Sequence, residues 1–215
     1  SFVSVQTALV MYPIHQYGNE EQKKKWIPLL ASGRKIGCFG LTEPDHGSDP
    51  AGIETRARRS GDKWILNGTK RWITNGSISD IAIVWAKDDE GEIQGFIVEC
   101  ESEGFQTLDI KKKLSLRASV TSDLIMDDVE VPDNNRLPNG SGLSSPLGCL
   151  NQARYGIAWG SIGAAMACYD WAVNYTADRR QFDKPIASFQ LVQEKLANIL
   201  TEITKGQLLS WRLGR

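Results

Sequence analysis

The sequence predicts an α+β protein in which helices, a central strand-rich domain and a helical bundle follow one another along the chain. Apolar residues recur at helical spacing near both ends, and short apolar runs alternate with glycine-containing turns between them. We therefore divide the chain into an N-terminal helical region (1–34), a central β-barrel domain (35–134) and the first two helices of a C-terminal bundle (147–215).

The N-terminal region has the signals of a capped helix. Asn19 is followed three residues later by Gln22, which is the spacing of a capping box, and Glu20 and Glu21 place acids at the positive end of the helix dipole. Gly33 supplies a stop signal. We expect a helix that begins after Asn19 and ends just before Gly33.

The central region has the turn signals of a small β-barrel or sandwich. Gly61-Asp62 separates two runs that read as a hairpin. Further strands are expected at Ile81–Trp85, Ile93–Val98, Leu124–Met126 and Val129–Val131. Residues 132–146 carry three prolines and two glycines, so we interpret them as a loop or a domain linker.

The last third of the chain predicts two long helices. The first runs from about Leu147 to about Arg180, Lys184-Pro185 interrupts the pattern, and the second helix starts near Ser188. Two long neighbouring helices of this kind are typical of a bundle. Ser1 is not an initiator residue and the last helix has no stop signal, so we expect an internal piece of a longer protein, incomplete at both ends.

The composition excludes several function classes. Lys and Arg number 25 against 26 Asp and Glu, a net charge of -1, which gives no electrostatic reason to expect a nucleic-acid partner. The two histidines exclude a multi-histidine metal site, and the four cysteines lack metal-like spacing. No apolar run is long enough for stable membrane insertion.

Two stretches are candidates for a ligand site. Residues 36–49 form a short apolar run that opens into a loop with Thr42, Ser48 and glycines, which let a ligand approach the backbone closely. In the second stretch, Trp72 and Thr74 lie two residues apart and share one face of a strand. An aromatic ring beside a hydrogen-bond donor suits a planar heteroaromatic cofactor.

Several separate motifs, in a fixed order, agree with this reading. They are Ser4–Gln6, Cys38–Pro44, Gly47–Asp49, Trp72–Asn75, Leu116–Ser119 and Cys149–Gly160. In these segments the chain resembles the flavin-dependent acyl-CoA dehydrogenases, and within that family most closely the glutaryl-CoA dehydrogenases. The resemblance extends along the whole chain.

The resemblance implies an FAD whose flavin ring lies between the β domain and the C-terminal bundle. Leu41 and Thr42 then hydrogen-bond the pyrimidine edge, Trp72 packs on the ring and Thr74 donates to its reactive N5. The implied cofactor-binding residues of this region are Phe39, Leu41, Thr42, Gly47, Ser48, Trp72, Ile73 and Thr74.

The resemblance also implies contacts between subunits. Arg179, Phe182 and Gln190 are expected to bind the FAD of a neighbouring subunit, which implies a homotetramer built as a dimer of dimers. The chain departs from the family pattern at Asp183, where the family usually has glycine. An anion there lies near the FAD phosphates if the loop keeps its path.

The chemistry of the family needs a glutamate base that removes the α-proton. The resemblance places it beyond Arg215, and the alternative position seen in some relatives is Ala153 here, so we expect no catalytic residue within this chain. We interpret Glu43 as a structural turn partner. The implied substrate-binding residues are Ser1, Ser4, Ser48, Leu147, Asn151 and Arg154, with Ser4 matching a ligand of a distal carboxylate.

The sequence therefore predicts an FAD-dependent acyl-CoA dehydrogenase that oxidises and decarboxylates glutaryl-CoA to crotonyl-CoA and passes electrons to an electron-transfer flavoprotein. One alternative is a short-chain acyl-CoA oxidase that uses O2. Another is a truncated, non-catalytic module that binds FAD or CoA. The expected compartment is the cytoplasm in a bacterium and the mitochondrial matrix in a eukaryote.

Overall fold

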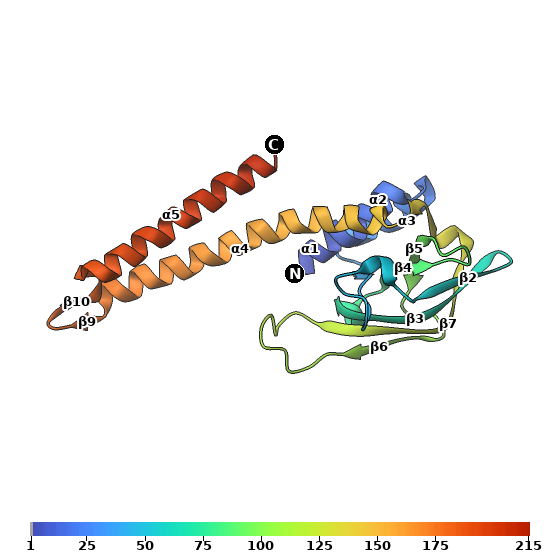
Figure 1. Cartoon of the computed structure of the whole chain (residues 1–215), viewed down its shortest axis with the longest axis horizontal. Coiled ribbons are helices and arrows are strands. Elements are labelled where there is room, and N and C mark those ends of the chain that lie inside the picture. Colours follow the sequence, from blue (N-terminus) through green and yellow to red (C-terminus); the bar gives the residue numbers. More distant parts are fainter. Residues whose placement is uncertain (1) are drawn as a thin grey trace. The chain divides into compact units, whose positions relative to one another are not determined.

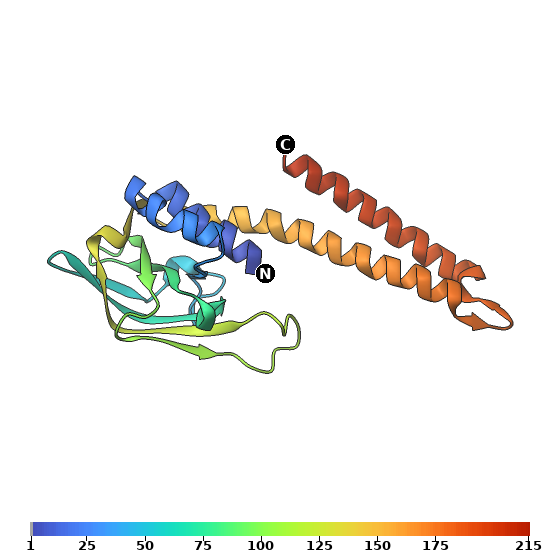
Figure 2. The ribbon, with the colours of Figure 1, turned by 180° about the vertical axis from the view of Figure 1, so that it is seen from behind.

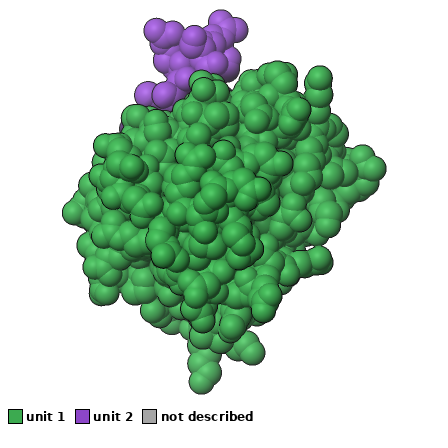
Figure 3. Space-filling model, turned by 90° about the vertical axis from the view of Figure 1, so that its right-hand side faces the viewer, with its two compact units in different colours: residues 1–153 green, residues 154–215 purple. Residues whose placement is uncertain are grey.

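The computed structural model describes residues 2–215, which form two compact units (Figures 1–3). The first unit ends at Ala153 and the second begins at Arg154. The predicted α+β class, with helices first, a central strand domain and helices last, is confirmed.

The N-terminal helices form as the sequence predicts. The first is continuous through α1 (Phe2–Ser4), η1 (Val5–Met11) and α2 (Tyr12–Tyr17), and its middle part has π-helical hydrogen bonding. The second is α3 (Glu20–Ala31), and its capping box is confirmed: Asn19 Oδ1 accepts from the Gln22 amide at 2.8 Å, and Gln22 Oε1 accepts from the Asn19 amide at 3.0 Å.

Eight strands build the central sheet. In chain order they are β1 (Gly37–Gly40), β2 (Arg56–Ser60), β3 (Lys63–Thr74), β4 (Ile81–Lys87), β5 (Ile93–Glu99), β6 (Phe105–Asp109), β7 (Thr121–Pro132) and β8 (Arg136–Ser141). Their spatial order is β6-β7-β3-β2-β4-β5-β8, with β1 paired to β4 in parallel. Short 3-10 turns lie at η2 (Pro50–Gly52), η3 (Gly76–Ile78) and η4 (Asp133–Asn135).

The sheet is folded into two layers. Strands β6, β7, β3 and β2 form one layer, and β1, β4, β5 and β8 form the other; Arg56 and Lys87 are the one register pair between β2 and β4. Within the described residues the strand order ends at β6 and β8 and does not return on itself. Of the two arrangements that the turn signals leave open, the structure is therefore nearer to a sandwich than to a closed barrel.

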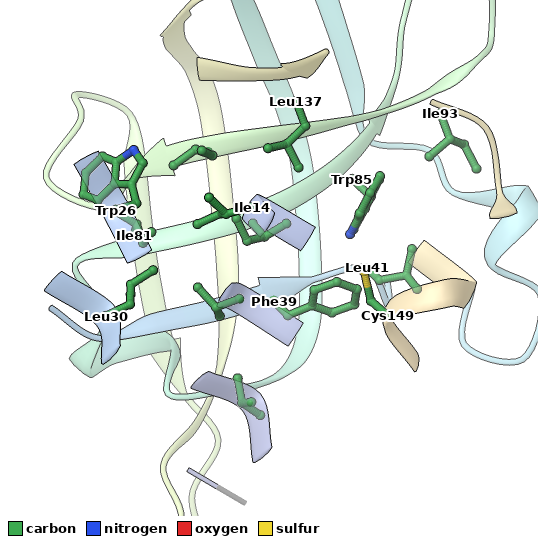
Figure 4. Packing of buried hydrophobic residues seen from close by; sticks show 14 of the residues in the cluster. Ile14, Trp26, Leu30, Phe39, Leu41, Ile81, Trp85, Ile93, Leu137 and Cys149 are labelled. Atoms are coloured by element: carbon green, nitrogen blue, oxygen red, sulfur yellow. The ribbon is translucent and has the colours of Figure 1, made fainter. Parts of the chain in front are cut away.

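Strand β4 is buried on both faces and explains how the layers hold together. Ile81 and Trp85 point toward the N-terminal helices, where they pack in one cluster with Ile14 (Figure 4). The alternating residues Ala82 and Val84 point into the space between the two sheet layers. Because successive side chains of a strand face opposite sides, one short apolar strand joins two cores.

The interpretation of residues 132–146 as a loop or linker is wrong. Residues Arg136–Ser141 form β8, which pairs with β5 and completes the edge of the sheet, and the following helix already begins at Ser144. Pro138 does not prevent this, because an edge strand tolerates proline. The prolines and glycines of this segment thus mark an edge strand and a helix start.

The second unit consists of two long helices and a tight hairpin. Helix α4 (Ser144–Asp178) begins in the first unit and continues through the second, and α5 (Gln190–Leu213) turns back along its second half (Figure 1). The hairpin between them contains β9 (Arg180–Gln181), β10 (Lys184–Pro185) and η5 (Ile186–Ser188). The predicted interruption at Lys184-Pro185 is this hairpin.

The backbone of the hairpin explains why glycine suits position 183. Phe182 and Asp183 have φ angles of 54° and 61°, and positive φ at both central residues is the pattern of a type I′ turn. We expect Asp183→Gly to stabilise the second unit by about 0.5–1 kcal/mol, because glycine adopts positive φ without strain. Asp183→Ala is the matched control and is expected to destabilise. Thermal unfolding of both variants checks this, and equal shifts of one sign would contradict it.

Candidate functional site

The first unit contains a cleft of about 200 Å³ beside the carboxyl end of β1. Its walls come from η1, from β1 and the loop after it, from the end of β3 and from the start of α4. The lining residues are Val5, Leu9, Phe39, Leu41, Thr42, Gly47, Pro50, Trp72, Ile73, Thr74 and Leu150. Most of these are apolar, and two threonines supply the polar groups.

In the described part of the chain, the turn after β1 has a backbone donor without a partner at a residue that lines the cleft. The carbonyl of Thr42 accepts from the Arg71 amide at 2.7 Å, which ties this turn to β3. Within residues 2–215, neither the amide of Thr42 nor the hydroxyl of Thr74 has a hydrogen-bond partner. Both groups are therefore available to a polar ligand atom.

Trp72 is held in an unusual backbone conformation at the cleft. Its φ is 63°, and the β3–β7 register shifts between Lys70 and Ile73, so Trp72 lies in a bulge. Positive φ in a bulky residue costs about 1–3 kcal/mol and persists where the surrounding structure enforces it, often at functional sites. The Trp72 side chain is 56% exposed, which leaves a large aromatic surface open to a planar ligand.

An ion pair lies buried directly behind this turn. Lys70 is 0% exposed and its Nζ donates to Glu43 Oε1 at 2.8 Å and to the Leu41 carbonyl at 3.2 Å. Burial lowers the pKa of Lys70 to about 8, although the charge and hydrogen bond of Glu43 act to raise it.

Glu43 also makes several hydrogen bonds within the fold. Its carboxylate accepts from the amides of Glu54 and Thr55 and from the Thr55 hydroxyl. Burial raises its pKa, but Lys70 and these donors outweigh that effect, so the pKa of Glu43 is lowered. The interpretation of Glu43 as a structural turn partner agrees with these bonds.

The cleft brings together most of the residues predicted to bind the cofactor. Seven of them line it: Phe39, Leu41, Thr42, Gly47, Trp72, Ile73 and Thr74. Ser48 is exposed on the same loop, next to Gly47, and does not line the cleft. These seven residues come from two segments about 30 positions apart in the sequence, which supports the two-stretch prediction.

The other predicted residues lie elsewhere. Ser4 is in α1, while Leu147 and Asn151 are on the part of α4 that belongs to the first unit; none of the three lines the cleft. Ser1 lies outside the described residues. The second unit contains the remaining four, Arg154, Arg179, Phe182 and Gln190, all of which are exposed.

The residues predicted from the sequence to bind the cofactor do not include four apolar wall residues or Lys70. The wall residues are Val5, Leu9, Pro50 and Leu150. An apolar side chain in a helix gives no signal that distinguishes a cleft wall from a core. The position of Lys70 was a usable signal. It lies on the same side of β3 as the buried Leu66, and a buried charge at such a position needs a charged partner.

In the part of the chain that the structure describes, no group of His, Cys, Asp and Glu side chains could hold a metal ion. None of the described helices is long and apolar enough to cross a bilayer.

Comparison with family models assigns the chain to one family. The middle domain of acyl-CoA dehydrogenase matches residues 38–129, its C-terminal domain matches residues 140–215 and its N-terminal domain matches residues 1–34. The chain belongs to the acyl-CoA dehydrogenase family. The three matches follow in the order of the helices, the sheet and the helices described above.

Curated relatives agree with this assignment. The mitochondrial short-chain specific acyl-CoA dehydrogenase of Homo sapiens is 38% identical over 215 residues, which cover 98% of this chain and 52% of that protein. A glutaryl-CoA dehydrogenase of Desulfococcus multivorans is 39% identical over 207 residues, covering 94% of this chain and 53% of that protein. The chain thus spans about half the length of the curated relatives it matches.

Solved structures share the fold closely. Glutaryl-CoA dehydrogenase from Mycobacterium smegmatis has a TM-score of 0.97 at 58% identity, covering 100% of this chain and 55% of that one. A second structure, of a glutaryl-CoA dehydrogenase from the same organism in complex with FADH2, has a TM-score of 0.97 at 56% identity, with the same coverage. A glutaryl-coenzyme A dehydrogenase in complex with glutaryl-CoA has a TM-score of 0.93 at 37% identity, covering 98% of this chain and 55% of that one.

Proposed function

We propose that this chain forms the flavin-binding part of an FAD-dependent acyl-CoA dehydrogenase. The observation that carries the proposal is the cleft in which the exposed face of Trp72 lies with two unpartnered donors, the Thr42 amide and the Thr74 hydroxyl. The family assignment and the relative bound to FADH2 support the same cofactor.

The residues at the cleft fit a flavin. A flavin needs an apolar surface for its rings and donors for the oxygen and nitrogen atoms at its edges. Phe39, Leu41 and Trp72 supply apolar surface, and Thr42 and Thr74 supply donors. The pyrimidine edge is assigned to Thr42 and the reactive nitrogen to Thr74, as the family resemblance implies.

When bound, FAD would supply the hydride acceptor for the oxidation of an acyl-CoA. The chain's own residues would bind and orient the flavin: Trp72 would pack on the ring, and the two donors would stabilise negative charge at its edges. The apolar lining excludes water from this surface. No described residue is proposed as the base, because Glu43 is paired with Lys70 and position 153 is alanine.

Glutaryl-CoA is the proposed substrate, with decarboxylation to crotonyl-CoA following oxidation. Support comes from the similarity to glutaryl-CoA dehydrogenases, and from the family resemblance at Ser4, which implies a ligand of the distal carboxylate. Ser48, Leu147, Asn151 and Arg154 are assigned to the acyl-CoA chain. An electron-transfer flavoprotein is the proposed electron acceptor.

A homotetramer is proposed on the basis of the second unit. Both of its helices expose large apolar side chains, a pattern expected of helices that pack against others in a bundle or an assembly. Arg179, Phe182 and Gln190 are assigned to the FAD of a neighbouring subunit. The compartment is proposed to be the cytoplasm in a bacterium and the mitochondrial matrix in a eukaryote.

The first experiment is the visible absorption spectrum of the purified, desalted whole protein. A flavin spectrum in near-stoichiometric amount, bleached by glutaryl-CoA without oxygen, is the expected result. A folded protein that stays colourless after incubation with FAD would contradict the proposal. Formation of peroxide in air at the rate of substrate oxidation would favour the alternative of an acyl-CoA oxidase.

Thr74→Val tests the assignment of the hydroxyl in the whole protein. We expect flavin content to stay near that of the wild type and the rate of flavin reduction by acyl-CoA to fall about 100-fold, because one preorganised donor to developing charge is lost. Stopped-flow reduction measures the rate. Thr107→Val, at an exposed position of β6, is the matched control and should leave the rate unchanged.

A further inference from the structure

One charged side chain beside the cleft has no role in the chemistry above. Lys70 lies in the middle of β3 with an exposed fraction of 0%, and its stem packs so closely on β1 that a Cβ at Gly40 would lie 3.1 Å from Lys70 Cγ. A lysine is almost never fully buried unless it is paired. Its position is therefore a specific feature of this site.

The pair with Glu43 does not account for Lys70 through stability alone. A buried ion pair often adds little net stability compared with two apolar residues, because both charges lose their hydration. Such a pair can instead fix one local conformation. Here the local conformation is the turn from Leu41 to Glu43, which Lys70 contacts at both ends, through the Leu41 carbonyl and the Glu43 carboxylate.

The contact with Leu41 acts on the peptide group that carries the Thr42 amide. The Leu41 carbonyl and the Thr42 amide belong to one peptide group, and in a trans peptide these two bonds point in opposite directions. Lys70 on the carbonyl side therefore directs the Thr42 N–H away from itself, and Thr42 lines the cleft. A cation on the carbonyl also polarises the peptide and makes its N–H a stronger donor.

We propose that Lys70 is a positioning residue for the flavin: held by Glu43, its buried ammonium orients and polarises the Leu41–Thr42 peptide so that the Thr42 amide binds the pyrimidine edge. This inference rests on the proposed function. The ion pair should therefore strengthen the binding of the flavin and favour its reduced, more negative form over the oxidised form.

The test uses the double variant Lys70→Met/Glu43→Gln of the purified whole protein, reconstituted with FAD. Methionine keeps much of the apolar stem, and the neutral glutamine leaves no unpaired charge, so this variant is expected to fold. Its melting temperature is expected to be lower than that of the wild type, because the glutamine NH2 cannot accept from one of the two backbone amides that Glu43 binds. We expect its dissociation constant for FAD to rise about tenfold. The preference for reduced over oxidised flavin should also fall about tenfold, equivalent to a midpoint potential about 30 mV lower.

A matched control lies on the same strand. Lys63 of β3 pairs with Glu130 of β7, and both side chains are partly exposed, so Lys63→Met/Glu130→Gln removes an ion pair far less buried than that of Lys70. This variant should keep the wild-type affinity and potential. Glu43→Gln alone is the second test variant, because without its partner Lys70 loses the interaction that favours its charged form.

The outcomes separate the two proposals. A folded double variant, or a folded Glu43→Gln variant, with wild-type affinity for FAD and wild-type midpoint potential would overturn the role of Lys70 while the proposed function stands. Wild-type protein that binds no FAD would overturn the proposed function, and this inference with it. Losses in the test variants that the Lys63 control does not share support the inference.

Discussion

Replacing Lys70 by methionine without changing Glu43 is expected to lower the free energy of unfolding by about 3–5 kcal/mol. The wild-type pair is fully buried, with Lys70 Nζ 2.8 Å from Glu43 Oε1. The single change leaves the Glu43 carboxylate in place without its cation, and an unpaired buried charge costs far more than a lost surface contact. Denaturant unfolding followed by circular dichroism measures the difference.

Lys63→Met is the control for this prediction. Lys63 lies on the same strand, but its side chain is 39% exposed and its pair with Glu130 is screened by water, so we expect a loss of about 0–1 kcal/mol. Equal losses for Lys63→Met and Lys70→Met would show that burial of the pair has no energetic consequence.

The pH dependence gives the prediction a second readout. The pKa of Glu43 is lowered in the folded wild type, so its contribution to stability is present above the unfolded value of 4.5 and is lost as the pH falls through the folded pKa. Removing Lys70 raises the pKa of Glu43 relative to the wild type. The deficit of Lys70→Met should therefore be smaller at pH 4 than at pH 7, and a deficit that grows on acidification would contradict this account.

The order of elements could be predicted from local sequence signals because each signal acts over a few residues. The capping box of Asn19 and Gln22 and the hairpin at Gly61-Asp62 depend only on neighbouring backbone groups, and both form as predicted. The prediction of a loop at residues 132–146 was wrong because it also used local signals alone. Its prolines and glycines are local turn signals, whereas β8 exists because β5 offers it an edge.

The candidate site also has some features with a local sequence signal and others without one. Trp72 and Thr74 could be placed together because they are close neighbours in the sequence, although the bulge and the positive φ of Trp72 interrupt the regular strand alternation and have no local sequence signal. The pairing of Lys70 with Glu43 joins positions 27 residues apart. Their charges are visible in the sequence, but their shared burial results from the packing of β3 against the turn after β1.

Gln6→Leu is expected to lower the free energy of unfolding by about 4 kcal/mol, because a buried side chain loses three hydrogen bonds to backbone groups. The Leu30 carbonyl keeps the Gly33 amide as a donor at 3.1 Å, so the cost falls mainly on the Lys35 carbonyl and the Gly37 amide. Gln6 lies in η1 with an exposed fraction of 5%. Its Nε2 donates to the carbonyls of Leu30 at 3.0 Å and Lys35 at 2.8 Å, and its Oε1 accepts from the Gly37 amide at 2.9 Å. One side chain therefore joins η1, the end of α3 and the first residue of β1, and leucine of similar size cannot make any of the three bonds.

The loss of these hydrogen bonds should also disturb the cleft, because β1 leads directly into the turn that lines the cleft. Gly37 begins β1, and Leu41 and Thr42 follow four and five residues later. We expect Gln6→Leu to bind FAD more weakly even where the variant is fully folded, measured by FAD titration at low temperature. Gln16→Leu, at an exposed position of α2, is the matched control and should change stability by less than about 0.5 kcal/mol. If both variants unfolded alike and bound FAD alike, Gln6 would not be what anchors β1 to the helices.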